Sequence, residues 1–142
     1  MKPSNPDYES ETRRVFDQAP FIRQLGAELI EFSPGRCRTR ITLNENHKQQ
    51  DGFVHAGVQA TLADHSCGTA AATLIGSGQR VLTADFTVNL LRPAQGHTLE
   101  CEAKVIKQGK TLTVAEGEVY AVGEQRKLVA KATVTLAIVT VG

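Results

Sequence analysis

One carboxylate, Asp64, lies in a stretch that otherwise carries no full charge at neutral pH, residues 53–75. The stretch is built from small and apolar residues on almost every side, which is typical of a buried helix. Burial of a carboxylate is unfavourable unless the group is paired or its pKa rises. We therefore expect Asp64 to act chemically, as a general base for water or as a nucleophile that forms a mixed anhydride. The alternative is a structural Asp that caps a neighbouring element.

The first turn of the same expected helix supplies the second candidate group. The backbone N–H groups of Ala56 and Gly57 have no partner within the helix, and the positive end of the helix dipole favours a developing oxyanion there. A helix start that needs small residues for packing is the alternative. Ala56 and Asp64 are eight residues apart, which is about 12 Å along a helix at ~1.5 Å per residue. One substrate carbonyl cannot touch both in one chain, so a site that uses both needs two chains.

Cysteine chemistry and metal binding are disfavoured. The three cysteines, Cys37, Cys67 and Cys101, form no CxxC or Cys/His metal motif, and we expect buried, reduced thiols. A nucleophilic Cys67 is the alternative, but His65 is two residues away and faces another side of a helix. For the same reason His65 does not form a dyad with the adjacent Asp64. His47 and His97 are expected to be solvated, and neither a metal nor another cofactor is expected.

Length and charge place the chain in a broad class. The 142 residues are expected to form a single domain, 1–142, with 1–19 as an N-terminal lead and short helix. Sixteen basic residues against fifteen acidic ones, with no long basic run, argue against a nucleic-acid partner. No segment has the ~20 apolar residues of a membrane span, and the N-terminus lacks an apolar signal core. A cytoplasmic location without membrane contact is therefore expected.

The order of elements predicts an α+β fold. We expect a helix over 9–19 that ends at Pro20, an apolar link over 21–25, a hairpin of strands 27–32 and 36–43, and a long helix from about residue 55 to Gly76. Four strands follow, over 80–92, 98–107, 111–122 and 128–141. Short breaks between them favour antiparallel pairing. A curved sheet of about six strands would wrap the helix, and a second subunit would cover its open side.

Several motifs together resemble the hotdog-fold acyl-CoA thioesterases, in particular the phenylacetate-pathway type and its 4-hydroxybenzoyl-CoA thioesterase relatives. They are Gln49-x-x-Gly52-x-x-His55-Ala56-Gly57, Leu62-Ala63-Asp64, 85–94 and 105–111. The resemblance covers about residues 20–140. The family usually has Gly where this chain has Ala56, which keeps the N–H but adds a methyl group. The resemblance implies a hotdog fold, a site at a dimer interface and the Ala56 N–H as an oxyanion donor.

The resemblance also implies roles for other residues. Gln49 would orient water or the thioester. The alternative is that Gln49 is a solvated loop residue. His55 would contact substrate or bridge loop and helix, Thr83 would help to hold water or pack in the sheet, and Gly52 belongs to the same motif. Arg92 and Lys110 lie at expected strand ends, where they could meet coenzyme A phosphates or remain solvated.

The expected function is hydrolysis of an acyl-CoA thioester to a carboxylic acid and free coenzyme A. Asp64 would promote water attack, and the partner chain's amides would stabilise the oxyanion. A hotdog hydratase or dehydratase for enoyl or 3-hydroxyacyl thioesters is one alternative, and a non-catalytic acyl-CoA-binding module is another. The expected assembly is a homo-oligomer, at least a dimer, with a tetramer favoured. The sequence leaves the acyl group open.

Overall fold

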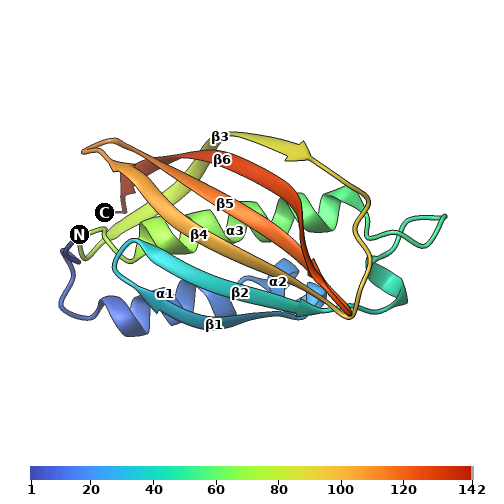
Figure 1. Cartoon of the computed structure of the whole chain (residues 1–142). Coiled ribbons are helices and arrows are strands. Elements are labelled where there is room, and N and C mark those ends of the chain that lie inside the picture. The colour runs from blue at the N-terminus through green and yellow to red at the C-terminus, as the bar shows by residue number, and fades with distance from the viewer. Residues whose placement is uncertain (142) are drawn as a thin grey trace.

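The chain folds as one antiparallel sheet around a long helix (Figure 1). The computed structural model describes residues 1–141. Two N-terminal helices, α1 (Tyr8–Asp17) and α2 (Pro20–Leu25), precede the hairpin of β1 (Ala27–Ser33) and β2 (Arg36–Thr42). A single 3-10 turn, η1 (Glu45–His47), leads to the central helix α3 (Ala56–Ala72). Four long strands follow: β3 (Gln79–Leu90), β4 (Thr98–Gln108), β5 (Leu112–Val122) and β6 (Arg126–Thr140).

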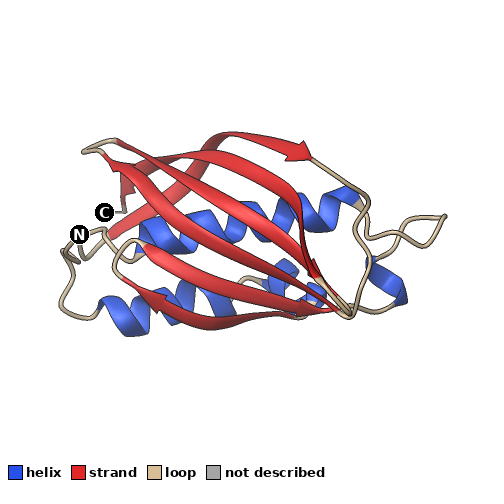
Figure 2. Cartoon of the chain, in the orientation of Figure 1, coloured by secondary structure: helices blue, strands red, loops and turns tan. Residues whose placement is uncertain are grey.

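The six strands form a single sheet in the order β1-β2-β4-β5-β6-β3, and every neighbouring pair is antiparallel. Figure 2 shows the helices together on one side of this curved sheet. Alternation explains the arrangement, because every second residue of β4 and β5 is buried while the residues between them are more exposed. The expected hotdog fold, a curved antiparallel sheet of six strands wrapped around one long helix, is confirmed.

The core lies between α3 and the sheet. Small side chains on α3, such as Ala63, Cys67 and Ala70, are fully buried there. Their size lets the sheet approach the helix closely: a Cβ built on Gly117 of β5 would lie 3.2 Å from Cys67 Sγ. Two buried hydroxyls on this side pair with each other, since those of Thr39 and Ser66 bond at 2.8 Å. Alanine-rich composition is thus what allows close wrapping.

The N-terminal region differs from expectation in two ways. Residues 21–25, expected to be a link, belong to the helix α2, because Pro20 occupies its first turn, where a missing N–H costs nothing. The open side of α3, expected to need a second subunit, is partly covered by α1. The Phe16 and His65 rings lie 4.9 Å apart between centroids, and Tyr8 of α1 packs edge-on against Phe32 of β1.

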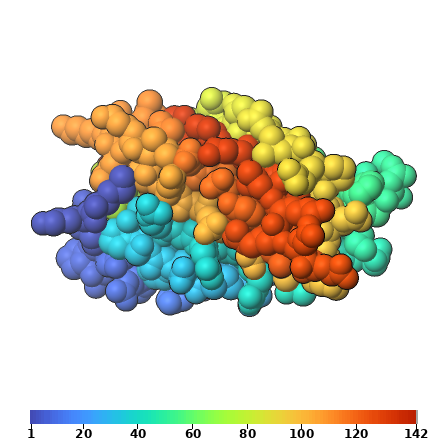
Figure 3. Space-filling view, in the orientation of Figure 1, coloured from blue at the N-terminus to red at the C-terminus, as the bar shows by residue number. Residues whose placement is uncertain are grey.

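The two edges of the sheet are unlike each other. β1 is a seven-residue strand against which α1 packs, whereas β3 has twelve residues and is exposed along most of its length. In Figure 3, β3 (yellow) runs along the margin of the molecule beside β6 (red). A long exposed edge with apolar side chains is unusual in a protein that stays monomeric. No helix within residues 1–141 is long and apolar enough to cross a membrane.

Candidate active site

Asp64 is held by a neighbouring strand rather than buried in the core. It lies on the flank of α3 that faces β3, and the Thr83 hydroxyl donates a hydrogen bond of 2.7 Å to its Oδ1. The carboxylate is only partly buried in a single chain, so the expectation of a buried acid is wrong for the isolated subunit. One carboxylate oxygen is fixed by Thr83, and within residues 1–141 Oδ2 makes no hydrogen bond, so it can meet water or substrate.

A bulge in β3 accompanies the Thr83 contact. Thr83 pairs with the buried Leu136 of β6, and Asp85 pairs with the next residue along, so Ala84 is an extra residue between them. Residues directly opposite each other share a face of the sheet, which places Thr83 on the helix side. Phe86, opposite the buried Val134, returns to that side beyond the bulge. Without an extra residue, regular alternation would put either Thr83 or Phe86 on the outer face.

The first turn of α3 is capped by its own preceding residue. His55 is the N-cap, and its Nδ1 accepts a hydrogen bond of 2.8 Å from the Gly57 N–H. The cap uses Nδ1 as the acceptor and commits the Gly57 amide. Within residues 1–141, the Ala56 N–H makes no hydrogen bond. Ala56 is exposed, so its amide is the donor that a ligand can reach in this conformation.

The loop before α3 contains Gln49 and Gly52. The Gln49 Oε1 accepts from the N–H groups of Asp51 and Phe53 and so braces a turn. Gly52 sits in this turn at φ +88°, a left-handed conformation that favours glycine. Figure 1 shows the loop projecting from the end of the molecule. In one chain, these contacts are local to the loop, and none joins Gln49 or Gly52 to Asp64.

Two histidines, His65 and His47, contact backbone carbonyl groups of other segments. The ring of His65 turns to α1, where its Nε2 lies 3.3 Å from the Phe16 carbonyl oxygen; burial lowers the pKa of His65. The expectation that His47 is solvated is wrong. His47 is only 3% exposed. Its two ring nitrogens bond the Asn44 N–H and the Leu25 carbonyl at 3.0 and 2.8 Å.

The three thiols are buried, as expected. Burial raises the pKa of the Cys101 thiol to about 12 and raises those of Cys37 and Cys67 well above the usual value. A thiol with a raised pKa carries little thiolate at neutral pH. Cys67 therefore lacks the features of a nucleophile.

Arg92 and Lys110 do not converge within one chain. Arg92 follows β3 at the end of the sheet where the β5–β6 hairpin turns, and Lys110 lies in the β4–β5 turn at the other end. The intervening strand β5 has eleven residues, or ~36 Å at about 3.3 Å per residue. Arg92 borders an open cleft of about 840 Å³, whereas Lys110 borders a smaller cavity of about 190 Å³.

Comparison with known proteins identifies the family. The Thioesterase superfamily model matches residues 51–128, a range that includes the α3 first turn, Asp64 and Thr83. The chain belongs to the thioesterase superfamily. It is 37% identical over 105 residues to a protein of Halobacterium salinarum named as a candidate esterase, with 70% of this chain and 69% of that protein covered.

Two further thioesterases match over most of the chain. Human acyl-coenzyme A thioesterase 13 is 33% identical over 94 residues, which cover 65% of this chain and 66% of that protein. The crystal structure of a thioesterase family protein from Silicibacter pomeroyi superposes with a TM-score of 0.92 at 36% identity, covering 94% of this chain and 99% of that one. The curated relatives of this superfamily member include acyl-CoA thioesterases and hydrolases.

Proposed function

We propose that this superfamily member hydrolyses acyl-CoA thioesters to a carboxylic acid and free coenzyme A, at a site shared between two subunits. The observation that carries the proposal is the placement of Asp64, an accessible carboxylate fixed by Thr83 on the same helix whose first turn presents the Ala56 N–H. The acid and the amide are about 12 Å apart along α3, at ~1.5 Å per residue. One carbonyl can meet both only if a second chain supplies one of them.

The exposed edge of the sheet supports a second chain beside this site. Phe86 and Leu90 of β3 face the helix side, opposite the buried Val134 and Ala130, yet they are 44% and 52% exposed. The chain's own α3 therefore leaves them largely uncovered. A second copy paired along β3 would bury these side chains and bring its own α3 towards Asp64, and burial of an aromatic and an aliphatic side chain is favourable.

Two routes fit the acid. As a general base, Asp64 takes a proton from water while the water oxygen bonds to the thioester carbonyl carbon. The resulting oxyanion is stabilised by the Ala56 N–H of the partner chain. Collapse of the tetrahedral intermediate breaks the C–S bond, and the departing thiolate of coenzyme A takes up the proton. As a nucleophile, Asp64 Oδ2 attacks the carbonyl carbon and expels the thiolate, and water then hydrolyses the mixed anhydride.

The site disfavours the other enzyme class that the sequence left open. A hydratase or dehydratase would combine the acid with a histidine, but His65 faces α1 and the Nδ1 of His55 is committed to Gly57. The subtype we propose is the phenylacetate-pathway type, which the sequence motifs resemble, and the substrate panel below decides the acyl group. In that setting Gln49 would orient the water or the carbonyl, and Arg92 and Lys110 of different subunits would approach the coenzyme A phosphates.

A panel of acyl-CoA substrates tests the proposal directly. Phenylacetyl-CoA, hydroxybenzoyl-CoA and straight-chain acyl-CoA esters are incubated with the protein, and free thiol release is measured with wild type and Asp64→Asn. We expect wild type to release thiol from at least one class. Asp64→Asn should lose at least ~100-fold in kcat, since general-base catalysis alone contributes about 10²–10⁴-fold. A folded Asp64→Asn protein within about threefold of wild type would exclude both routes.

A further inference from the structure

An open cleft lies at the end of the sheet beside the first turn of α3. The loop between β3 and β4 forms one wall and the β5–β6 hairpin forms the other, with a volume of about 840 Å³. Phe53, three residues before Ala56, also lines the cleft. The Val54 N–H bonds the Ala94 carbonyl at 2.9 Å, which fastens this wall to the loop that leads into the helix. The cleft therefore adjoins the segment that leads into the first turn of α3.

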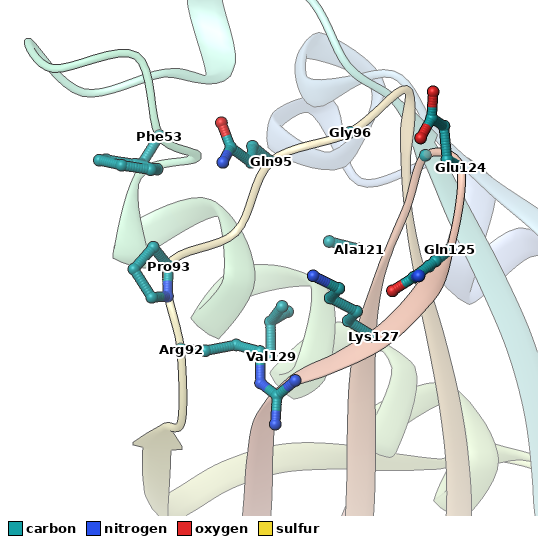
Figure 4. A pocket seen from close by; sticks show the side chains of 11 residues that line it. Phe53, Arg92, Pro93, Gln95, Gly96, Ala121, Glu124, Gln125, Lys127 and Val129 are labelled. Atoms are coloured by element: carbon teal, nitrogen blue, oxygen red, sulfur yellow. The ribbon is translucent and has the colours of Figure 1, made fainter.

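Two cations from different segments line this cleft: Lys127 belongs to β6, and Arg92 lies in the loop that follows β3. Figure 4 shows the Lys127 side chain extending from β6 towards the β3–β4 loop, with the Arg92 guanidinium below it. Within residues 1–141, neither Lys127 nor Arg92 has a carboxylate within 4 Å. Glu124, the acidic residue of the lining, lies at the opposite rim.

The outer face of the sheet gives a contrast. Three strand cations there are paired: Lys104 and Lys131 both meet Glu116, and Arg126 meets Glu100 and Glu102. The cleft thus combines uncompensated positive charge with apolar surface from Phe53 and Val129 and amides from Gln95 and Gln125. Such a lining suits an anion attached to a flat, partly apolar group.

We propose that this cleft binds the phosphorylated nucleotide of coenzyme A, with Lys127 as a specificity-determining residue that selects coenzyme A esters over shorter thioesters. The inference rests on the proposed function and names the part of the substrate that this end of the site recognises. The volume lies within the ~300–1,000 Å³ typical of small-molecule sites. Charge-assisted bonds from Lys127 and Arg92 would hold the phosphates while the thioester lies at the α3 first turn.

Paired substrates test the role of Lys127. The same acyl group is offered as the coenzyme A ester and as the N-acetylcysteamine ester, which has neither phosphate nor nucleotide. For Lys127→Gln, we expect a rise of about tenfold in KM for the coenzyme A ester with kcat unchanged, because the interaction is lost equally from ground and transition states. Kinetics with the short ester should match wild type. Lys104→Gln, the same charge change on the outer face, should alter neither substrate's KM.

The outcomes separate the two proposals. If Lys127→Gln leaves KM for the coenzyme A ester within twofold, or shifts both esters equally, the cleft does not select the nucleotide. If wild type hydrolyses neither ester, the proposed hydrolysis fails. The nucleotide site is then tested by a binding measurement that needs no turnover. Isothermal titration with adenosine 3′,5′-bisphosphate should show binding to wild type and about tenfold weaker binding to both Lys127→Gln and Arg92→Gln. Equal affinity in all three, or no binding to wild type, overturns the nucleotide site.

Discussion

The Thr83 hydroxyl donates to Asp64 Oδ1 across 2.7 Å, which joins an edge strand to the central helix at the candidate acid. This contact fixes the carboxylate with one oxygen occupied and the other free. Removal of the hydroxyl in Thr83→Val keeps the side-chain shape. We expect kcat to fall about 10- to 100-fold, corresponding to the ~1.5–3 kcal/mol of a hydrogen bond to a charged group.

Thr83→Ser is the matched control, because it restores the donor. Its kcat should return to within about threefold of wild type, a recovery that a purely packing role for Thr83 would not produce. Steady-state kinetics on all three proteins, with circular dichroism to confirm folding, make the comparison. Equal rates for the Val and Ser variants would show that the hydroxyl does not act on Asp64.

His65 should make stability depend on pH. Burial against α1 lowers its pKa from an ordinary value of 6.5, while the neighbouring Asp64 opposes that effect. As the pH falls below about 6.5, the unfolded chain takes up a proton that the folded chain resists, so folding weakens until the pH passes the lower folded pKa. Above that window the contribution is fully present.

Urea unfolding at pH 7.0 and pH 5.0 measures this effect. Wild type should lose more stability between the two pH values than His65→Gln, which keeps a donor for the Phe16 carbonyl but does not titrate. Comparison of the two proteins removes the contribution of the other titrating groups. Identical losses would mean that His65 is not protected from protonation by the fold.

The buried thiols should be unreactive in the native protein. Because the pKa values of Cys37, Cys67 and Cys101 are all raised by burial, native protein should not react with Ellman's reagent over minutes. After unfolding, all three cysteines of the sequence should react. Cys67→Ala should also retain hydrolysis; a folded Cys67→Ala protein without activity would restore the thiol nucleophile.

His47 should matter for stability rather than for catalysis. His47→Phe leaves the Asn44 N–H and the Leu25 carbonyl without their partners, at a cost of about 1–3 kcal/mol in the free energy of unfolding. His97→Phe, at an exposed position, is the control and should change stability by less than about 0.5 kcal/mol. Denaturant unfolding of both variants gives the comparison, and equal midpoints would contradict the role of the buried ring.

The fold was predictable where a local pattern reports directly on packing. Strict alternation in β2 marks a half-buried strand, and the uncharged composition around Asp64 marks the central helix. The separation of Ala56 and Asp64 was also predictable, because a helix fixes the spacing of two residues along its axis. Arrangement across distant segments was less accessible. The burial of His47 depends on a carbonyl at Leu25, 22 residues earlier, and no local signal marks that pairing.

Two further features, the helix α2 and the cleft with Lys127, could not be predicted from local sequence patterns. Pro20 reads as a stop signal, but the same residue begins α2, because proline suits a first helical turn as well as a break. The cleft with Lys127 combines a loop, a hairpin and the segment before α3. Lys127 by itself looks like an ordinary solvated charge near a strand start, and only the assembled sheet sets it opposite Arg92.

Mixing two inactive variants tests the shared site most directly. One subunit carries Asp64→Asn and the other Ala56→Pro. Proline removes the N–H at the first helical position, and the extended backbone of His55, at φ −60° and ψ 138°, already suits a following proline. The two proteins are co-refolded, heterodimers are isolated through two tags, and thiol release from acyl-CoA is measured. Folding of the Ala56→Pro homodimer is checked by circular dichroism.

Each homodimer should be nearly inactive, because both of its sites lack one component. In the heterodimer, one site combines Asp64 of one chain with the Ala56 N–H of the other, and the second site lacks both. Thiol release per heterodimer should therefore return to about half of the wild-type rate, by the separation of the two groups along α3. Purified heterodimers as inactive as both parents would contradict a site built from two chains.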